Sequence, residues 1–76
     1  MSTANMIPRS TQAQRQEVRA RLVQRGLHPQ FAADEHQPLF DAAGIVCPPS
    51  ESITWTLQQA SQGAVHRLLT TLRERP

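Results

Sequence analysis

Residues 50–74 read SESITWTLQQASQGAVHRLLTTLRE, and the spacing of their apolar side chains decides the class of fold. Steps of three and four residues place one apolar set on a single helical face: Ile53, Leu57, Ala60, Ala64 and Leu68. A second set is rotated from the first and consists of Val65, Leu69 and Leu72. The rotation occurs at residues 61–63. The spacing therefore predicts a helix over residues 50–61, capped by Ser50, and another over residues 63–74, separated by a break or a kink.

A strand is the alternative for residues 52–57. Their sequence, Ser-Ile-Thr-Trp-Thr-Leu, alternates apolar and β-branched polar residues, which is typical of a strand. Pairing with residues 45–47 across the intervening turn would make a minor β-hairpin over residues 45–57. We expect the helix instead, because the helical spacing continues past Leu57.

The amino-terminal third carries clear signals for the two ends of a helix. Thr11 and Gln14 have the spacing of a capping box, in which side chains satisfy free amides of the first turn. Gly26 can adopt the left-handed conformation that ends a helix. A helix is therefore expected from Thr11 to about Arg25, with a thin apolar stripe of Val18, Leu22 and Val23.

The middle of the chain contains two shorter helical candidates. Pro29 and Pro38 each suit the first position of a helix, where no backbone N–H is needed. We expect short helices over residues 29–36 and 38–43. The core residues expected from this region are Phe31, Leu39, Phe40 and Ala43.

Together these elements predict an all-α fold, a small bundle of three to five short helices. Residues 1–9 look like a flexible N-terminal leader, or an arm that uses Met6, Ile7 and Arg9 to contact a partner. Residues 10–76 then form a single small helical domain. Because a domain of this size buries only about 60% of its unfolded surface, the C-terminal helix is expected either to pack on the middle segment or to form a homodimer.

The composition bounds the origin and the location of the protein. All eight basic residues are arginine, and together with the many alanine, glutamine and proline residues this indicates a GC-rich bacterial, plasmid or phage genome. The formal net charge is +2. The single cysteine, Cys47, excludes an intrachain disulfide and fits a reducing cytoplasm. The sequence lacks both a secretory signal pattern and an apolar run of the ~20 residues that a membrane span needs. We therefore expect a cytoplasmic protein with no membrane partner.

Residues 39–60 follow the order of a helix-turn-helix: a short helix, a turn with Gly44, and a capped second helix. The outward face of that second helix would carry Thr54, Trp55, Gln58, Gln59 and Gln62, and glutamine can pair with adenine. Two features weigh against base reading. The connector is longer than the usual turn, and this face has no arginine, the residue that makes the commonest specific contact.

Arginines line the first helix, and three of them lack an obvious local partner: Arg15, Arg19 and Arg25. Glu17 and Arg21, by contrast, have the favourable spacing for an ion pair. The unpaired arginines could meet an acidic protein surface or track a phosphate backbone, or simply be solvated. Trp55 points outward on the helical interpretation, and exposed aromatic residues anchor protein interfaces.

Catalysis and cofactor chemistry have little support in the sequence. Cys47 has no histidine at a spacing that suggests an activated nucleophile. The acidic residues and histidines near it show no regular metal-ligand spacing. We therefore expect neither an enzyme nor a cofactor, a metal site or a small-molecule substrate.

The predicted function is that of a small non-enzymatic binding protein. In this interpretation it is a phage- or plasmid-type modulator that docks on a host protein, such as transcription machinery. The predicted partner-binding residues are Arg15, Arg19, Arg25, Trp55, Gln58, Gln59 and Gln62. The alternative is a DNA-binding transcriptional regulator that uses residues 50–61 to recognise duplex DNA.

Overall fold

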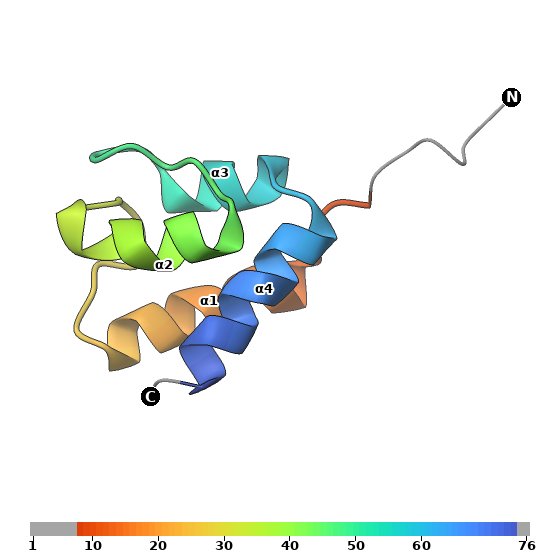
Figure 1. The fold of residues 1–76 in the computed structure, drawn as a ribbon, viewed down its shortest axis with the longest axis horizontal. Helices are drawn as coiled ribbons and strands as arrows, with labels where there is room; N and C mark the ends of the chain where they lie inside the picture. Colours follow the sequence, from red (N-terminus) through yellow and green to blue (C-terminus); the bar gives the residue numbers. More distant parts are fainter. Residues whose placement is uncertain (1–7, 75–76) are drawn as a thin grey trace, which may run out of the picture.

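The computed structural model describes residues 8–74 and consists mainly of helix (Figure 1). Four α-helices and one 3₁₀ turn follow each other along the chain: α1 (Gln12–Gln24), η2 (Asp34–His36), α2 (Gln37–Ala43), α3 (Ile53–Gln59) and α4 (Gln62–Glu74). Within residues 8–74 the only β-type pairings are two isolated bridges. The predicted all-α bundle is confirmed, and the alternative β-hairpin over residues 45–57 is wrong because residues 53–59 are helical.

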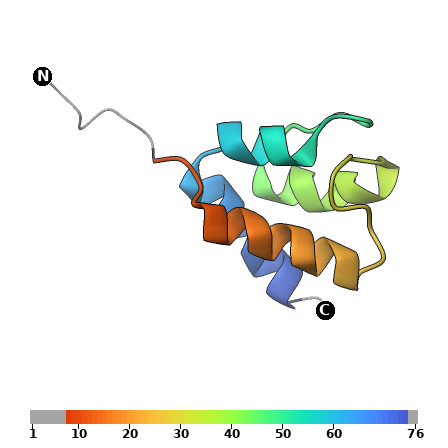
Figure 2. The same cartoon turned by 180° about the vertical axis from the view of Figure 1, so that it is seen from behind.

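Helix α4 lies at the centre of the core because it packs on both α1 and α2 (Figures 1 and 2). Its buried residues are Ala64, Val65, Leu68, Leu69 and Leu72. Two covering helices explain why the sequence carries two rotated apolar stripes. Burying each leucine contributes about 1.5–3 kcal/mol of hydrophobic free energy. The expected packing of the C-terminal helix on the middle segment is thus confirmed. The apolar residues of α4 are covered within one chain, so they need no second copy to bury them.

Helix α1 begins as its sequence predicts. The backbone N–H of Gln14 donates to Oγ1 of Thr11 at 3.1 Å, and the Gln14 side chain accepts from the Thr11 N–H at 2.9 Å. Val18 and Leu22 are fully buried, whereas Val23 is 56% exposed and does not belong to the core. A helix that packs along one narrow stripe leaves a residue adjacent to that stripe in solvent.

Helix α3 begins three residues later than predicted, and its cap is Ser52 instead of Ser50. Oγ of Ser52 accepts from the backbone N–H of Trp55 at 3.2 Å. Ser50 lies in the preceding turn with φ at 73°, a left-handed conformation that few residues other than glycine adopt readily. Pro48 and Pro49 cannot donate backbone hydrogen bonds, so the chain completes this turn before it enters the helix.

Residues 29–33 are not helical, since residues 29–30 form a bend and Phe31 an isolated bridge, so the predicted helix over residues 29–36 is wrong except for its last turn, η2. Three backbone hydrogen bonds tie residues 30–32 to residues 50–53. In this pairing Ala32 faces the core, whereas Phe31 is 52% exposed and is not the core residue that the sequence predicted. The N–H groups of Gln30 and Phe31 donate to Nδ1 of His28, and the carbonyls of Gln30 and Ala32 accept from residues 50–53, so these groups are not available to a local helix.

The break between α3 and α4 occurs where the change of stripe predicted it. Ala60 is extended, and the chain turns at Ser61, whose Oγ accepts from the backbone N–H of Ala64 at 3.1 Å. Pro8 and Arg9 lie against this junction, since the Pro8 carbonyl accepts from the Gln62 N–H at 2.8 Å and Arg9 forms a β-bridge with Ser61. Met6 and Ile7 of the expected arm lie outside the described residues.

Candidate functional site

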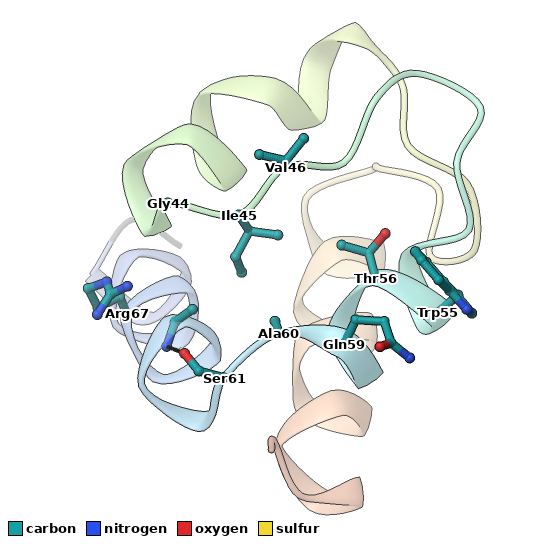
Figure 3. Close-up of a pocket in the computed structure, with 10 residues that line it drawn as sticks. Gly44, Ile45, Val46, Trp55, Thr56, Gln59, Ala60, Ser61 and Arg67 are labelled. Carbon is teal, nitrogen blue, oxygen red and sulfur yellow. Dashed lines mark hydrogen bonds between the residues drawn. The ribbon is translucent and has the colours of Figure 1, made fainter. Parts of the chain in front are cut away.

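A hollow opens between the connector after α2, the exposed side of α3 and the start of α4 (Figure 3). We call it the Trp55 pocket. Its volume is about 310 Å³, near the lower end of the range for ligand pockets. Its lining comprises Gly44, Ile45, Val46, Trp55, Thr56, Gln59, Ala60, Ser61, Ala64 and Arg67. These residues come from three separate segments, so the pocket exists only in the folded chain.

Trp55 lies on the first turn of α3 and is 56% exposed, which confirms its expected outward orientation. Its backbone is fixed, because its N–H donates to the Ser52 cap. The neighbouring residues Ile53, Thr56 and Leu57 are buried and hold this helix on the core. The indole therefore lies on a well-supported turn at one edge of the pocket, opposite Arg67 (Figure 3).

Val46 is the second large apolar side chain at the pocket and is 84% exposed. The residues on either side of it, Ile45 and Cys47, are buried, as alternation along an extended segment requires. Two hydrogen bonds fix this segment: the Ile45 N–H donates to the Phe40 carbonyl at 2.9 Å, and the Gln37 side chain donates to the Cys47 carbonyl at 2.8 Å. The exposure of Val46 is thus built into the connector.

Arg67 supplies the only charged side chain in the lining of the Trp55 pocket. Its Nε and Nη2 atoms donate to the carbonyl oxygen of Ala43 at 3.3 and 3.2 Å, which satisfies the carboxyl end of α2. A Cβ atom on Gly44 would lie 3.8 Å from Nη2, and one on Gly63 would lie 3.8 Å from Nη1. Two residues without side chains therefore flank the guanidinium group.

The glutamines of the predicted site are exposed but do not form one surface. Gln59 lines the Trp55 pocket, and Gln58 is exposed on α3 outside its lining. Gln62 borders a separate polar hollow of about 350 Å³ with Gln14, Gly63 and His66. The structure therefore joins Trp55 to Gln59 and separates both of them from Gln62.

The three arginines predicted to be unpartnered are all hydrogen-bonded within the chain. Arg15 donates to the Ser10 backbone carbonyl and to its hydroxyl group, and Arg19 has a long contact of 3.5 Å with Oγ1 of Thr54. Arg25 donates to the Leu72 carbonyl at 3.1 Å, although its buried Nε has no hydrogen-bond partner among the described residues. These side chains are half-buried and join α1 to its neighbours instead of forming a free arginine face.

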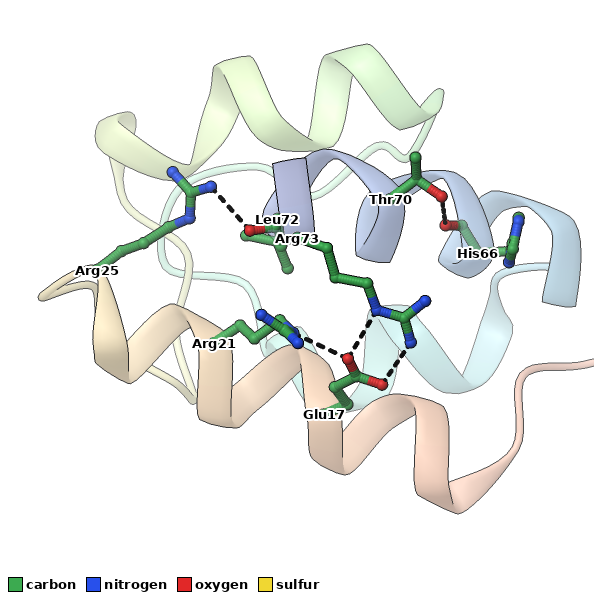
Figure 4. A network of polar contacts seen from close by, with 7 residues as sticks. All are labelled: Glu17, Arg21, Arg25, His66, Thr70, Leu72 and Arg73. Atoms are coloured by element: carbon green, nitrogen blue, oxygen red, sulfur yellow. Dashed lines mark hydrogen bonds and ion pairs between the residues drawn. The ribbon is translucent and has the colours of Figure 1, made fainter. Parts of the chain in front are cut away.

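The predicted pair of Glu17 and Arg21 is present at 2.8 Å, and Arg73 of α4 joins it (Figure 4). Nη2 of Arg73 lies 2.7 Å from Oε1 of Glu17, and its Nε lies 2.8 Å from Oε2. Hydrogen bonds from Arg73 and then Arg21 lower the pKa of Glu17 from 4.5 to about 2, and Glu17 in turn raises the pKa of Arg73. Both ion pairs within residues 8–74 use this one carboxylate.

The geometry departs from a helix-turn-helix in two respects. Residues 44–52 separate α2 from α3, and α3 packs on α1 without extensive contact with α2. In a helix-turn-helix the turn is short and the recognition helix lies against its predecessor. Helix α3 has only seven residues, none of which is basic. The connector before α3 and the packing of α3 therefore both differ from those of a helix-turn-helix.

Arg67 and Val46 line the pocket although neither was predicted as a site residue. Only the fold brings Arg67 next to the carboxyl end of α2, so no local pattern in the sequence could have indicated it. Within residues 8–74 the histidines, acidic residues and cysteine form no group of three or more that could hold a metal ion. No α-helix there has both the length and the apolar character that crossing a bilayer requires. No protein-family model, no curated protein and no solved structure matches the chain.

Proposed function

We propose that this chain is a non-enzymatic protein-binding module and that the Trp55 pocket is its docking surface. The observation that carries the proposal is the joint exposure of Trp55 and Val46 at one hollow. Exposed aromatic residues beside a pocket are typical of interface centres, where tryptophan is strongly enriched. Because both backbone segments are fixed by hydrogen bonds, little ordering cost remains when a partner binds.

The charged groups favour a protein partner over duplex DNA. Binding to DNA depends on arginines or lysines that are free to neutralise phosphates. Here Glu17 offsets charge on Arg21 and Arg73, and Arg67 is the only charged residue in the lining of the Trp55 pocket. The apolar side chains of Trp55 and Val46 would contribute no affinity for the phosphate backbone of a DNA duplex.

Site-specific crosslinking tests the proposal. A photoreactive amino acid replaces Trp55 in one variant and Val23 in the control, because both side chains are 56% exposed and Val23 lies on α1 outside the pocket. Each variant is irradiated in cells that naturally contain the chain, and lysates are treated with nuclease before capture. The expected result is a protein adduct at position 55 that is absent at position 23.

The captured protein is then purified and titrated against the unmodified chain. Because Trp55 is the only tryptophan, a partner without tryptophan should shift its emission directly. Binding should weaken with Trp55→Ala and persist with Val23→Ala. Adducts of equal yield at both positions, or only nuclease-sensitive nucleic acid, would contradict the proposal.

A further inference from the structure

Arg67 lines the Trp55 pocket, and one edge of its guanidinium group is occupied within the chain. The Nε and Nη2 atoms form the edge that donates to the Ala43 carbonyl. The end of the group, formed by Nη1 and Nη2, retains N–H donors that this contact does not use. Because the Ala43 carbonyl fixes one edge, the free end is held in place for a second acceptor.

Among residues 8–74, no carboxylate forms an ion pair with Arg67. The pocket lining contains no acidic residue, and both ion pairs within residues 8–74 are made by Glu17, on α1. A second guanidinium lies near the rim, because Nη1 of Arg9 donates to the backbone carbonyl of Gln59, a lining residue. The pocket is therefore bordered by Arg67 at one edge and by Arg9 near Gln59, and it exposes apolar surface at Val46 and Trp55 (Figure 3).

We propose that the pocket binds a peptide segment in which a large apolar residue lies close to an aspartate or a glutamate. The apolar side chain occupies the hollow beside Trp55 and Val46, and the carboxylate accepts two hydrogen bonds from the free end of Arg67. Arginine and carboxylate groups fit each other in this two-bond geometry, which gives specificity as well as free energy. This inference rests on the proposed docking function and specifies the partner that it recognises.

The size of the pocket supports a single anchoring side chain. A volume of about 310 Å³ is small for a whole ligand but sufficient for one or two large side chains. The partner segment then lies across the opening, with its acidic residue towards Arg67. Specificity comes from the pairing of the two groups, because an apolar residue alone would leave the Arg67 donors without an acceptor.

The test uses defined synthetic peptides and does not require the natural partner. Short Gly/Ser peptides with amidated carboxyl ends carry one phenylalanine or leucine and one glutamate at varied spacings. A matched series has glutamine in place of glutamate. A third series has glutamine and a free carboxyl terminus. Binding is followed by the emission of Trp55 and by the anisotropy of labelled peptides.

At least one glutamate spacing should bind roughly tenfold more tightly than its glutamine counterpart, as expected for one well-formed charged contact. The preference should disappear in Arg67→Gln and persist in Arg73→Gln, which removes the same charge from the far end of α4. Arg67→Lys keeps the positive charge but cannot donate two parallel hydrogen bonds, so it should retain part of the preference for glutamate. This variant replaces Arg67→Gln in the test if Arg67→Gln does not fold. Added salt should weaken the glutamate peptides more than the glutamine ones.

Several outcomes would overturn the inference, and they separate it from the proposed function. Equal binding of glutamate and glutamine peptides means that Arg67 does not recognise a carboxylate, while docking at Trp55 stands. A preference confined to free carboxyl termini excludes an internal acidic residue. If no peptide binds although a protein crosslinks at position 55, the partner is a folded surface of different chemistry. Binding of duplex DNA without any peptide or protein would remove both proposals.

Discussion

Glu17 of α1 and Arg73 of α4 are joined by two parallel hydrogen bonds of 2.7 and 2.8 Å, which connect helices that are far apart in the sequence (Figure 4). The fork of the guanidinium matches the two oxygens of the carboxylate, and Arg21 reinforces the contact from within α1. This is the clearest link between the amino-terminal helix and the last turn of the chain.

The first prediction concerns acid stability. The pKa of Glu17 is about 2 in the folded chain, compared with 4.5 for an unperturbed glutamate. The Glu17 contacts therefore stabilise the fold fully above pH 4.5, and this stabilisation is lost as the pH falls towards 2. Glu17→Gln should therefore lower the melting temperature at neutral pH and flatten the decline between these pH values. Thermal unfolding followed by circular dichroism across this range measures both effects. An unchanged acid profile would show that the contact contributes nothing.

The second prediction concerns His36, which is 1% exposed and lies 5.9 Å from the ring of Phe40. Its Nδ1 accepts from the Ala33 N–H at 2.9 Å, so its Nε2 carries the proton and donates to the His28 carbonyl at 2.8 Å. His36→Ala loses both bonds and leaves a cavity, at a cost of about 2–4 kcal/mol.

Urea unfolding monitored by circular dichroism measures this cost. His66→Ala is the control, because His66 is exposed on α4 and should change stability by less than about 0.5 kcal/mol. Similar midpoints for the two variants would show that the ring of His36 does not hold the segment before α2.

The third prediction distinguishes the two serines before α3. Ser52→Ala removes the cap of Trp55 N–H and should cost about 1 kcal/mol. Ser50→Gly relieves the left-handed backbone at φ of 73° and should stabilise the chain by roughly 1 kcal/mol. Opposite shifts of the unfolding midpoint are expected, and shifts in the same direction would contradict this assignment of the cap.

The fourth prediction concerns Trp55 in the isolated chain. An indole that is 56% exposed should emit at long wavelength and be quenched readily by acrylamide. Trp55→Ala should cost about 1–2 kcal/mol of unfolding free energy, less than the roughly 3–5 kcal/mol typical of a fully buried aromatic side chain, because just over half of Trp55 is already in solvent. A blue-shifted emission that resists quenching would show that the indole packs inside the domain.

The sequence predicted features that depend on nearby residues. The Thr11–Gln14 capping box and the Glu17–Arg21 pair lie three and four residues apart, so one helix fixes both. The outward position of Trp55 followed from the helical phase of its neighbours. The break before α4 was visible because the apolar stripe changes face there.

Features that depend on distant segments were not visible. Phe31 looked like a core residue, but pairing of residues 30–32 with residues 50–53 turned it outward. Arg15 and Arg25 looked unpartnered because their acceptors are backbone carbonyls, which no residue type signals. The same holds for Arg67, whose position in the candidate site depends on the Ala43 carbonyl at the end of another helix.

The hydrogen bond between the Pro8 carbonyl and the Gln62 N–H has a practical consequence for measuring affinity. It places the amino-terminal side of the domain next to Ser61, a lining residue of the Trp55 pocket, so a tether attached there would crowd the opening. Helix α4 has thirteen residues, which carry its carboxyl end roughly 20 Å away along its axis. Immobilising the chain on a sensor through its carboxyl terminus would leave the pocket facing the solution, so the direction of attachment alone could decide whether binding is observed.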